Sequence, residues 1–131
     1  FNPDISLKFL VDRNLNLWSI IGKGMNIKIC YALQPLANWC GKELSIEEEN
    51  IFNELEQIPH ARHVGSLIDI KKYDLIKNLI VQNCEKYNIE FMDCNEIIRK
   101  NNHHKEWLFL DRVHLNDKGN KYISEALLSL I

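Results

Sequence analysis

Hydrophobic and polar positions follow two different periods along this chain. Apolar residues at helical spacing predict an amphipathic helix over residues 4–22, with a weak point at Asn14. Gly22 and Gly24 should stop this helix and turn the chain. Residues 26–33 then form a short, mostly apolar run, which is typical of a strand buried on both faces of a parallel sheet.

Capping residues mark the next helix. Pro35 ends the apolar run. Ser45 is followed three residues later by Glu48, the signature of a capping box in which each residue bonds the other's backbone. A helix is therefore expected over residues 46–57, closed by Pro59.

The second half of the chain alternates helix and strand. Asp69 is a candidate N-cap for a helix with a broad apolar face made of Tyr73, Ile76, Leu79, Ile80, Cys84 and Tyr87. A short strand at residues 89–92 and a helix at 94–101 follow. Asn116 or Asp117 should cap the last helix, whose apolar face is Tyr122, Ile123, Ala126, Leu127 and Leu130. This alternation predicts one α/β domain over residues 1–131, with a parallel sheet and right-handed crossovers.

Composition and charge narrow the class of protein. The chain has 131 residues, of which 46% are hydrophobic and 26% charged, as in an ordinary soluble domain. Its formal charge of −2 argues against nucleic-acid binding, which usually needs clustered Lys and Arg. No apolar run approaches the roughly 20 residues that a membrane span requires. The sequence shows no signal peptide, and Phe1 in place of Met indicates a processed or cut N-terminus.

The four cysteines are Cys30, Cys40, Cys84 and Cys94, and no two of them form a Cys-x-x-Cys pair. Cys30 falls in the predicted strand and Cys84 on an apolar helix face, so both are expected to be small buried hydrophobic residues. Free thiols indicate a reducing compartment, and the cytoplasm is the default location.

The candidate chemistry lies near the C-terminus, where Asp111 stands three residues before His114, on a loop that ends where a helix begins. At this spacing the carboxylate can reach one ring nitrogen while the other faces a pocket. A histidine held in this way has a fixed tautomer, as a general base in acyl transfer requires. The same geometry is also compatible with a plain hydrogen bond within a loop.

The block Asp111-x-x-His114-Leu-Asn, with Gly119 and a closing amphipathic helix, resembles the last conserved block of the SGNH (GDSL-type) hydrolases. Residues 26–35, which end in Gln34-Pro35, resemble the family's late core strand and proline-containing loop. Residues 41–49 resemble the loop and helix start that follow it.

The resemblance implies a flavodoxin-like, three-layer α/β fold with a parallel sheet, of which this chain holds only the later strands and helices. It implies an esterase or carbohydrate O-deacetylase in which His114 is the catalytic base and Asp111 orients it. The family's Gly-Asp-Ser block and the glycine and asparagine of its oxyanion hole are absent from these 131 residues. Ser66, in Gly65-Ser66-Leu67, lacks the preceding Asp and follows the proline strand, so it is expected to be an ordinary turn serine.

Other polar clusters have simpler explanations. His60 and His63 have no acidic or cysteine partner at ligand spacing, and His103-His104 lie in a polar stretch, so loop histidines are expected and neither a metal nor a cofactor is implied. Residues 47–49, three glutamates in a first helical turn, are expected to form a solvated face that favours the helix dipole.

Three residues are weak candidates for substrate binding. Trp39 and Trp107 lie beside loops that the resemblance puts near the active site, where they would line an acyl or sugar pocket or simply pack in the core or its rim. Arg112 would contact an acidic substrate or face solvent.

Three functions fit these observations. The chain is the base-bearing portion of a serine esterase acting on a small-molecule or carbohydrate ester, a non-catalytic α/β binding or scaffold module, or one part of a split enzyme with the serine on a partner chain. If strands are missing on its N-terminal side, the first strand has an open edge through which the chain would self-associate or bind a partner.

Overall fold

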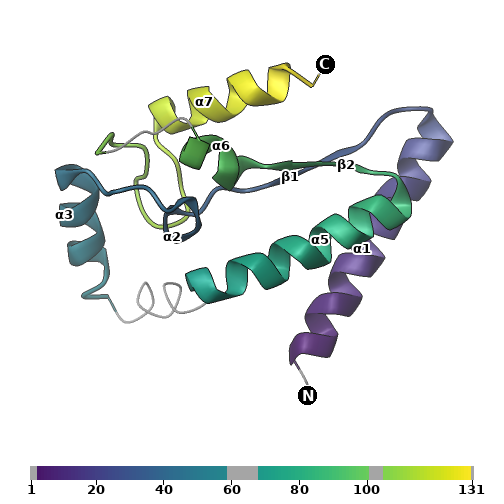
Figure 1. Ribbon diagram of the computed structural model, residues 1–131, viewed down its shortest axis with the longest axis horizontal. Coiled ribbons are helices and arrows are strands. Elements are labelled where there is room, and N and C mark those ends of the chain that lie inside the picture. Colours follow the sequence, from purple (N-terminus) through teal and green to yellow (C-terminus); the bar gives the residue numbers. More distant parts are fainter. Residues whose placement is uncertain (1–2, 59–67, 101–104, 131) are drawn as a thin grey trace. The chain divides into compact units, whose positions relative to one another are not determined.

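The computed structural model describes residues 3–58, 68–100 and 105–130. These residues form a mixed α/β structure, which confirms the predicted class (Figure 1). Its elements are α1 (Pro3–Met25), β1 (Cys30–Leu33), α2 (Ala37–Cys40), α3 (Ile46–Leu55), the 3-10 turn η1 (Ile70–Lys72), α5 (Tyr73–Tyr87), β2 (Glu90–Asp93), α6 (Cys94–Lys100) and α7 (Asp117–Leu128). β1 and β2 pair in a two-stranded parallel sheet. Residue contacts divide the chain into two compact units, residues 1–33 with 74–92 and residues 34–73 with 93–131.

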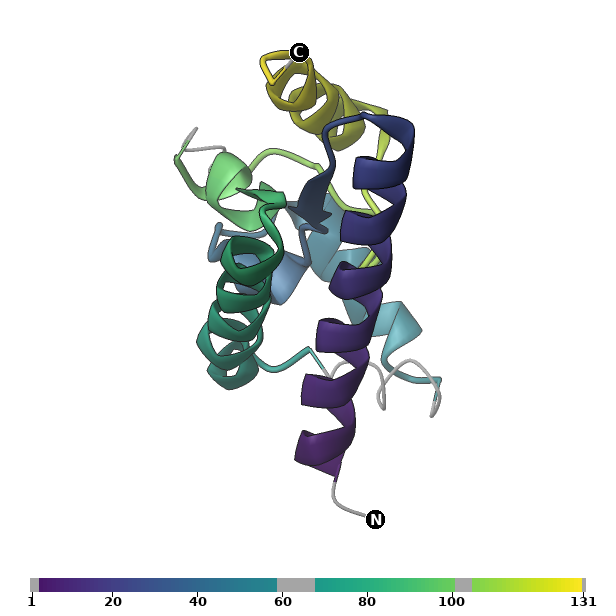
Figure 2. The same ribbon diagram turned by 90° about the vertical axis from the view of Figure 1, so that its right-hand side faces the viewer.

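The first unit joins α1, α5 and the sheet. Leu15 is buried on the inner face of α1, and the Ser19 hydroxyl donates to the carbonyl of Tyr87 at 2.9 Å. The Asp12 carboxylate accepts hydrogen bonds from Lys86 Nζ at 2.7 Å and from the Tyr87 hydroxyl at 2.9 Å. The last turn of α5 therefore contacts the middle of α1 (Figure 2).

Two predictions for the first unit are wrong. α1 does not stop at Gly22 but continues to Met25, and a Cβ atom at Gly22 would come within 2.8 Å of Ile29 Cγ1. This glycine therefore permits a close approach inside the unit rather than ending the helix. The strand is shorter than residues 26–33 and is not buried on both faces, since Cys30 is exposed and Leu33 is the one buried residue of the four. A two-stranded sheet has too few neighbouring elements to cover both faces of each strand.

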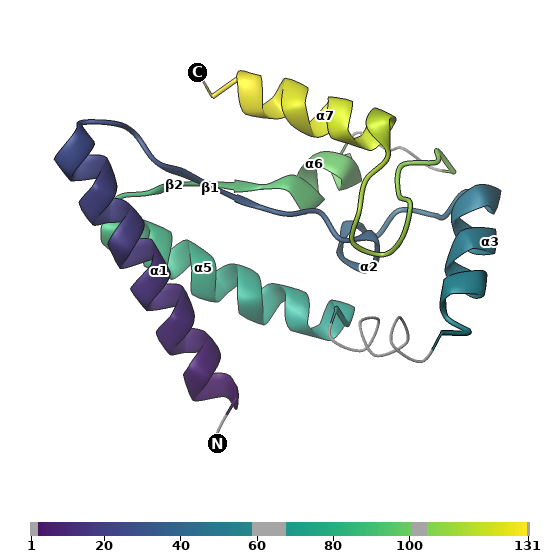
Figure 3. The ribbon, with the colours of Figure 1, turned by 180° about the vertical axis from the view of Figure 1, so that it is seen from behind.

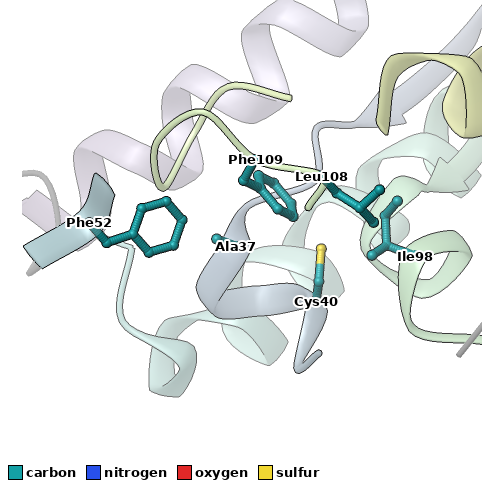
Figure 4. Packing of buried hydrophobic residues seen from close by; sticks show 6 residues of the cluster. All are labelled: Ala37, Cys40, Phe52, Ile98, Leu108 and Phe109. Carbon is teal, nitrogen blue, oxygen red and sulfur yellow. The ribbon is translucent and has the colours of Figure 1, made fainter. Parts of the chain in front are cut away.

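The second unit has its own apolar core (Figure 4). α2, α3, α6 and residues 108–109 contribute buried side chains to it: Ala37, Cys40, Phe52, Ile98, Leu108 and Phe109. Tyr122 and Ile123, on the predicted apolar face of α7, pack against this cluster. The short helix α2 was not expected from the sequence. It ends at Gly41, whose φ of 64° lies in the left-handed region that glycine adopts easily.

The predicted capping residues are largely confirmed. Ser45 Oγ accepts from Glu48 N at 3.2 Å, and Glu48 Oε2 accepts from Ser45 N at 2.9 Å, so the capping box is present. Asp69 caps the η1 turn that leads into α5, by accepting from Lys71 N at 2.9 Å. Of the two candidates for α7, Asn116 is the cap, since its side chain accepts from Gly119 N at 2.9 Å.

All four cysteines are free, and Cys40, Cys84 and Cys94 are buried, as predicted for Cys84. Burial raises the pKa of the Cys40 thiol to about 12 and that of Cys84 to about 11, so both are neutral at physiological pH. No helix in the described part of the chain is both long enough and apolar enough to cross a membrane. Ser66 and the histidines at positions 60, 63, 103 and 104 lie outside the described residues.

Candidate active-site loop

Residues 108–116, called here the 108–116 loop, form a hairpin-like turn before α7 (Figure 3). Phe109 and Leu115 form an antiparallel bridge at its base. Leu110 N donates to the His114 carbonyl at 2.8 Å, and Asn116 N donates to the Leu108 carbonyl at 2.8 Å. The loop is therefore a fixed backbone structure rather than an open connection.

Close packing explains why the motif has a glycine at position 119. A Cβ atom at this position would come within 2.7 Å of both the Leu108 carbonyl oxygen and Leu115 Cδ2. Because neither backbone nor a packed side chain can yield that much, only glycine lets the first turn of α7 lie against the 108–116 loop.

The tip of the loop brings Asp111 and His114 together. Asp111 Oδ2 lies 2.7 Å from His114 Nδ1. Asp111 Oδ1 accepts from the backbone N–H groups of Val113 and His114, each at 2.7 Å. An ionised carboxylate pairs with a protonated Nδ1, so this contact favours the tautomer that leaves a lone pair on Nε2. The predicted pairing of these two side chains is confirmed, and the His114 side chain is 70% exposed, so Nε2 is accessible to water.

Asp111 remains an anion in this setting. Partial burial acts to raise its pKa, but the hydrogen bonds from the His114 ring and from the backbone N–H groups of Val113 and His114 outweigh it. The pKa of Asp111 therefore lies below its ordinary value.

This shift predicts how the stability of the second unit depends on pH. A carboxyl group with a lowered folded-state pKa stabilises the fold fully above its unfolded pKa of about 3.9, and the contribution is lost as pH falls through the folded-state value. We expect Asp111→Asn to be less stable than the parent chain at pH 7. The difference should shrink below about pH 4. Urea unfolding of both chains between pH 7 and pH 3 measures this, and a difference that stays constant across that range would contradict it.

The tip of the loop is tied to the segment that follows β1. Gln34 Nε2 donates to the Val113 carbonyl at 2.8 Å, and Ala37 N donates to the Arg112 carbonyl at 3.0 Å. The segment itself is held by Asn95, which is fully buried: its Oδ1 accepts from Leu36 N at 2.9 Å and its Nδ2 donates to the Gln34 carbonyl at 3.1 Å. Two of the three sequence blocks that carry the resemblance, residues 26–35 and the block from Asp111 onward, therefore contact each other directly.

Arg112 has a structural role. Its guanidinium forms an ion pair with Glu56, donates to Asn38 Oδ1 at 2.6 Å and lies 4.8 Å above the centre of the Phe52 ring. With these partners, the side chain fastens the loop to α2 and α3. The interpretation of Arg112 as a solvent-facing residue is wrong, and the structure gives no support to one in which it binds substrate.

The two candidate tryptophans lie in different surroundings. Trp39 is buried, donates from Nε1 to the Asp69 carbonyl at 3.2 Å and stacks at a tilt against Tyr73 with ring centres 5.5 Å apart. It packs in the core, the simpler of its two predicted roles. Trp107 is 41% exposed and donates from Nε1 to the Phe109 carbonyl at 2.9 Å, so it lies at the rim of the 108–116 loop.

Glu48 is the residue whose role the sequence did not reveal. Glu47 and Glu49 are exposed as predicted, but Glu48 is completely buried, so the solvated face expected for all three is wrong for the middle one. Its Oε1 accepts from Leu108 N at 2.9 Å and from Phe109 N at 3.0 Å. The capping-box pattern predicted its bond to Ser45, but a local pattern carries no information about partners 60 residues away in sequence.

Two cavities, of about 630 and 320 Å³, are lined by residues of the first unit and include neither Asp111 nor His114. Within the described ranges, no group of three or more His, Cys, Asp or Glu side chains is arranged to hold a metal ion. His114 therefore lies on an exposed loop surface, and Asp111 is the side chain that orients its ring.

No protein-family model matches the chain, and a comparison with curated protein sequences finds no match either.

Proposed function

We propose that this chain supplies the catalytic base and its orienting acid to an SGNH-type serine esterase or carbohydrate O-deacetylase. The observation that carries the proposal is the 2.7 Å contact between Asp111 Oδ2 and His114 Nδ1, with the rest of the imidazole exposed. The nucleophilic serine and the oxyanion donors would come from outside these 131 residues, in a complete flavodoxin-like, three-layer fold.

His114 would act through Nε2. As the serine hydroxyl oxygen attacks the ester carbonyl carbon, Nε2 takes the hydroxyl proton and a tetrahedral intermediate forms. When the C–O bond to the leaving alcohol breaks, the imidazolium returns this proton to the alcohol oxygen. Water then hydrolyses the acyl-enzyme with the same base. The Asp111 carboxylate holds the ring throughout and faces the positive charge that it gains.

The substrate that we propose is a small-molecule or carbohydrate ester, the class on which this acyl-transfer chemistry acts. The proposal involves no cofactor or metal. Three buried free thiols fit a reducing compartment, and we propose the cytoplasm as the location.

A non-catalytic binding or scaffold module is the second candidate, and the 70% exposure of the His114 side chain favours it, because a working base usually lies in a partly enclosed cleft. A split enzyme with its serine on a partner chain is the third. It shares the geometry of the first proposal and differs only in the origin of the nucleophile.

The intact mass of the native protein, taken from its own source, separates these candidates. A mass well above 15.4 kDa, with peptides that contain a Gly-Asp-Ser segment, would support the serine esterase. A fluorophosphonate probe should then label that serine. A native mass of 15.4 kDa, no labelling and no copurifying second chain would leave the binding module.

The edge of β1 leads to a prediction about association. Within the described ranges, β1 pairs only with β2, and its residues Cys30–Leu33 carry no charge that would protect the other edge. α1 of the same unit exposes large apolar side chains, among them Trp18 at 51% and Ile21 at 41%. We expect the isolated chain to self-associate under reducing conditions as its concentration rises.

Ala32→Lys places a charge on this exposed strand and should weaken the association, whereas Leu75→Lys, on the exposed face of α5, should not. Sedimentation velocity of the three chains at increasing concentration makes the comparison. Equal weakening by both variants would show that surface charge alone, and not the strand edge, controls association.

A further inference from the structure

We infer that Glu48 is a positioning residue for the Asp111–His114 pair, which it holds through the base of the 108–116 loop. The inference deepens the proposed function and rests on it for its catalytic meaning. Its structural content, that Glu48 sets the geometry of His114, is testable without any activity.

Glu48 binds two backbone N–H groups at the base of the 108–116 loop. Its Oε1 accepts from the N–H groups of Leu108 and Phe109, both of which are fully buried. Phe109 is the residue that forms the antiparallel bridge with Leu115, directly after His114. The Glu48 carboxylate thus binds the backbone of residues 108–109, and the same short segment pairs with Leu115 through the antiparallel bridge.

Glu48 is itself held in place by contacts of its second carboxylate oxygen. Its Oε2 accepts from Ser45 N at 2.9 Å and pairs with Lys42 Nζ, whose side chain is only 2% exposed. Lys42 Nζ also donates to the Glu106 carbonyl at 2.9 Å. Both oxygens of one buried carboxylate are therefore used, and the same ion pair binds the chain at positions 106, 108 and 109.

The residues that Glu48 binds lie next to the Asp111–His114 pair in the chain. Only Leu110 separates Phe109 from Asp111, and the Leu110 N–H is bonded to the His114 carbonyl. A displacement of Phe109 therefore reaches both members of the pair through one residue. A catalytic group must be held within about 0.5 Å of its productive position, and buried, charge-assisted hydrogen bonds provide that restraint.

The test uses the 131-residue chain and ¹⁵N NMR of the His114 ring, which reports which nitrogen carries the proton. In the parent chain we expect the neutral ring to be protonated at Nδ1. Glu48→Asp keeps the charge beside Lys42 but is one methylene too short to reach Leu108 and Phe109, and Glu48→Gln keeps the length but loses the charge. Both should lower the population protonated at Nδ1 and speed the exchange of that proton with water.

Ser45→Ala is the matched control, because it removes a helix cap but leaves the contacts of Glu48 with Leu108 and Phe109 in place. It should leave the His114 ring signals unchanged although it lowers stability. Identical ring signals in the parent chain and both folded Glu48 variants would overturn the inference. If Glu48→Gln does not fold, Glu48→Asp, which keeps the ion pair, decides the result. Altered ring signals in the Glu48 variants of a protein that has no esterase activity would support the inference and contradict only the proposed function, since the ring signals do not depend on turnover.

Discussion

His114→Ala is expected to lower kcat/KM of the complete native protein toward a simple acetyl ester by at least about 10²–10⁴-fold, the usual contribution of general acid–base catalysis. The reason is that Nε2 is the acceptor for the serine proton in the proposed mechanism. The loss should appear mainly in kcat, since the imidazole contributes more to the transition state than to substrate binding. Steady-state kinetics of the parent and variant proteins measure it.

Lys121→Ala serves as the control for this experiment. Lys121 is an exposed residue of α7, and its loss should leave kcat and KM unchanged. Asp111→Asn offers a second, sharper comparison. An amide N–H₂ group facing Nδ1 would force the proton onto Nε2, so kcat should fall by about 10⁴-fold although the ring is still present. A His114→Ala protein that keeps more than a tenth of the parent kcat/KM would refute the role of His114 as the base.

Local sequence patterns predicted much of the site because its chemistry is local. Asp111 and His114 are three residues apart, and both bonds from the His114 ring and backbone go to one carboxylate. The same is true of the caps made by Ser45 and Asn116, which bond groups three residues away. In each case a spacing of three residues brings the two groups within reach of a hydrogen bond.

The features that the sequence did not predict depend on residues distant in the chain. Glu48 was expected to be solvated because its neighbours are acidic, and only the chain at positions 108 and 109 makes it a buried anchor. The sequence leaves two roles open for Arg112, substrate binding or exposure to solvent, because its ion-pair partner Glu56 lies far away in sequence. An apolar run predicts that Cys30 is buried, but it does not reveal how many helices and strands cover the strand, and Cys30 is exposed.

The second large effect is expected from Lys42→Met. Lys42 and Glu48 form an ion pair whose side chains are 2% and 0% exposed. Removing one partner of a buried pair leaves an uncompensated charge and typically costs about 3–5 kcal/mol. We expect the free energy of unfolding to fall by that amount, measured by urea denaturation with circular dichroism and tryptophan fluorescence as two probes.

Lys121→Met makes the same chemical change at an exposed pair. The Lys121 and Glu125 side chains are 70% and 59% exposed, and such pairs usually contribute less than about 1 kcal/mol. Equal losses from Lys42→Met and Lys121→Met would show that the buried pair has no special part in the fold.

The double variant Lys42→Met/Glu48→Leu determines why the pair is there. Replacing both members of a buried ion pair by apolar residues is often neutral, because no charge is left without a partner. Here the stability should not recover, since Leu at position 48 leaves the N–H groups of Leu108 and Phe109 without the acceptor they have in the parent chain. Each buried donor left in this way costs about 1–3 kcal/mol. Recovery to the parent free energy of unfolding would mean that Glu48 serves only to neutralise Lys42, whereas a double variant as unstable as Lys42→Met would show that the carboxylate is retained to hold the backbone of the 108–116 loop.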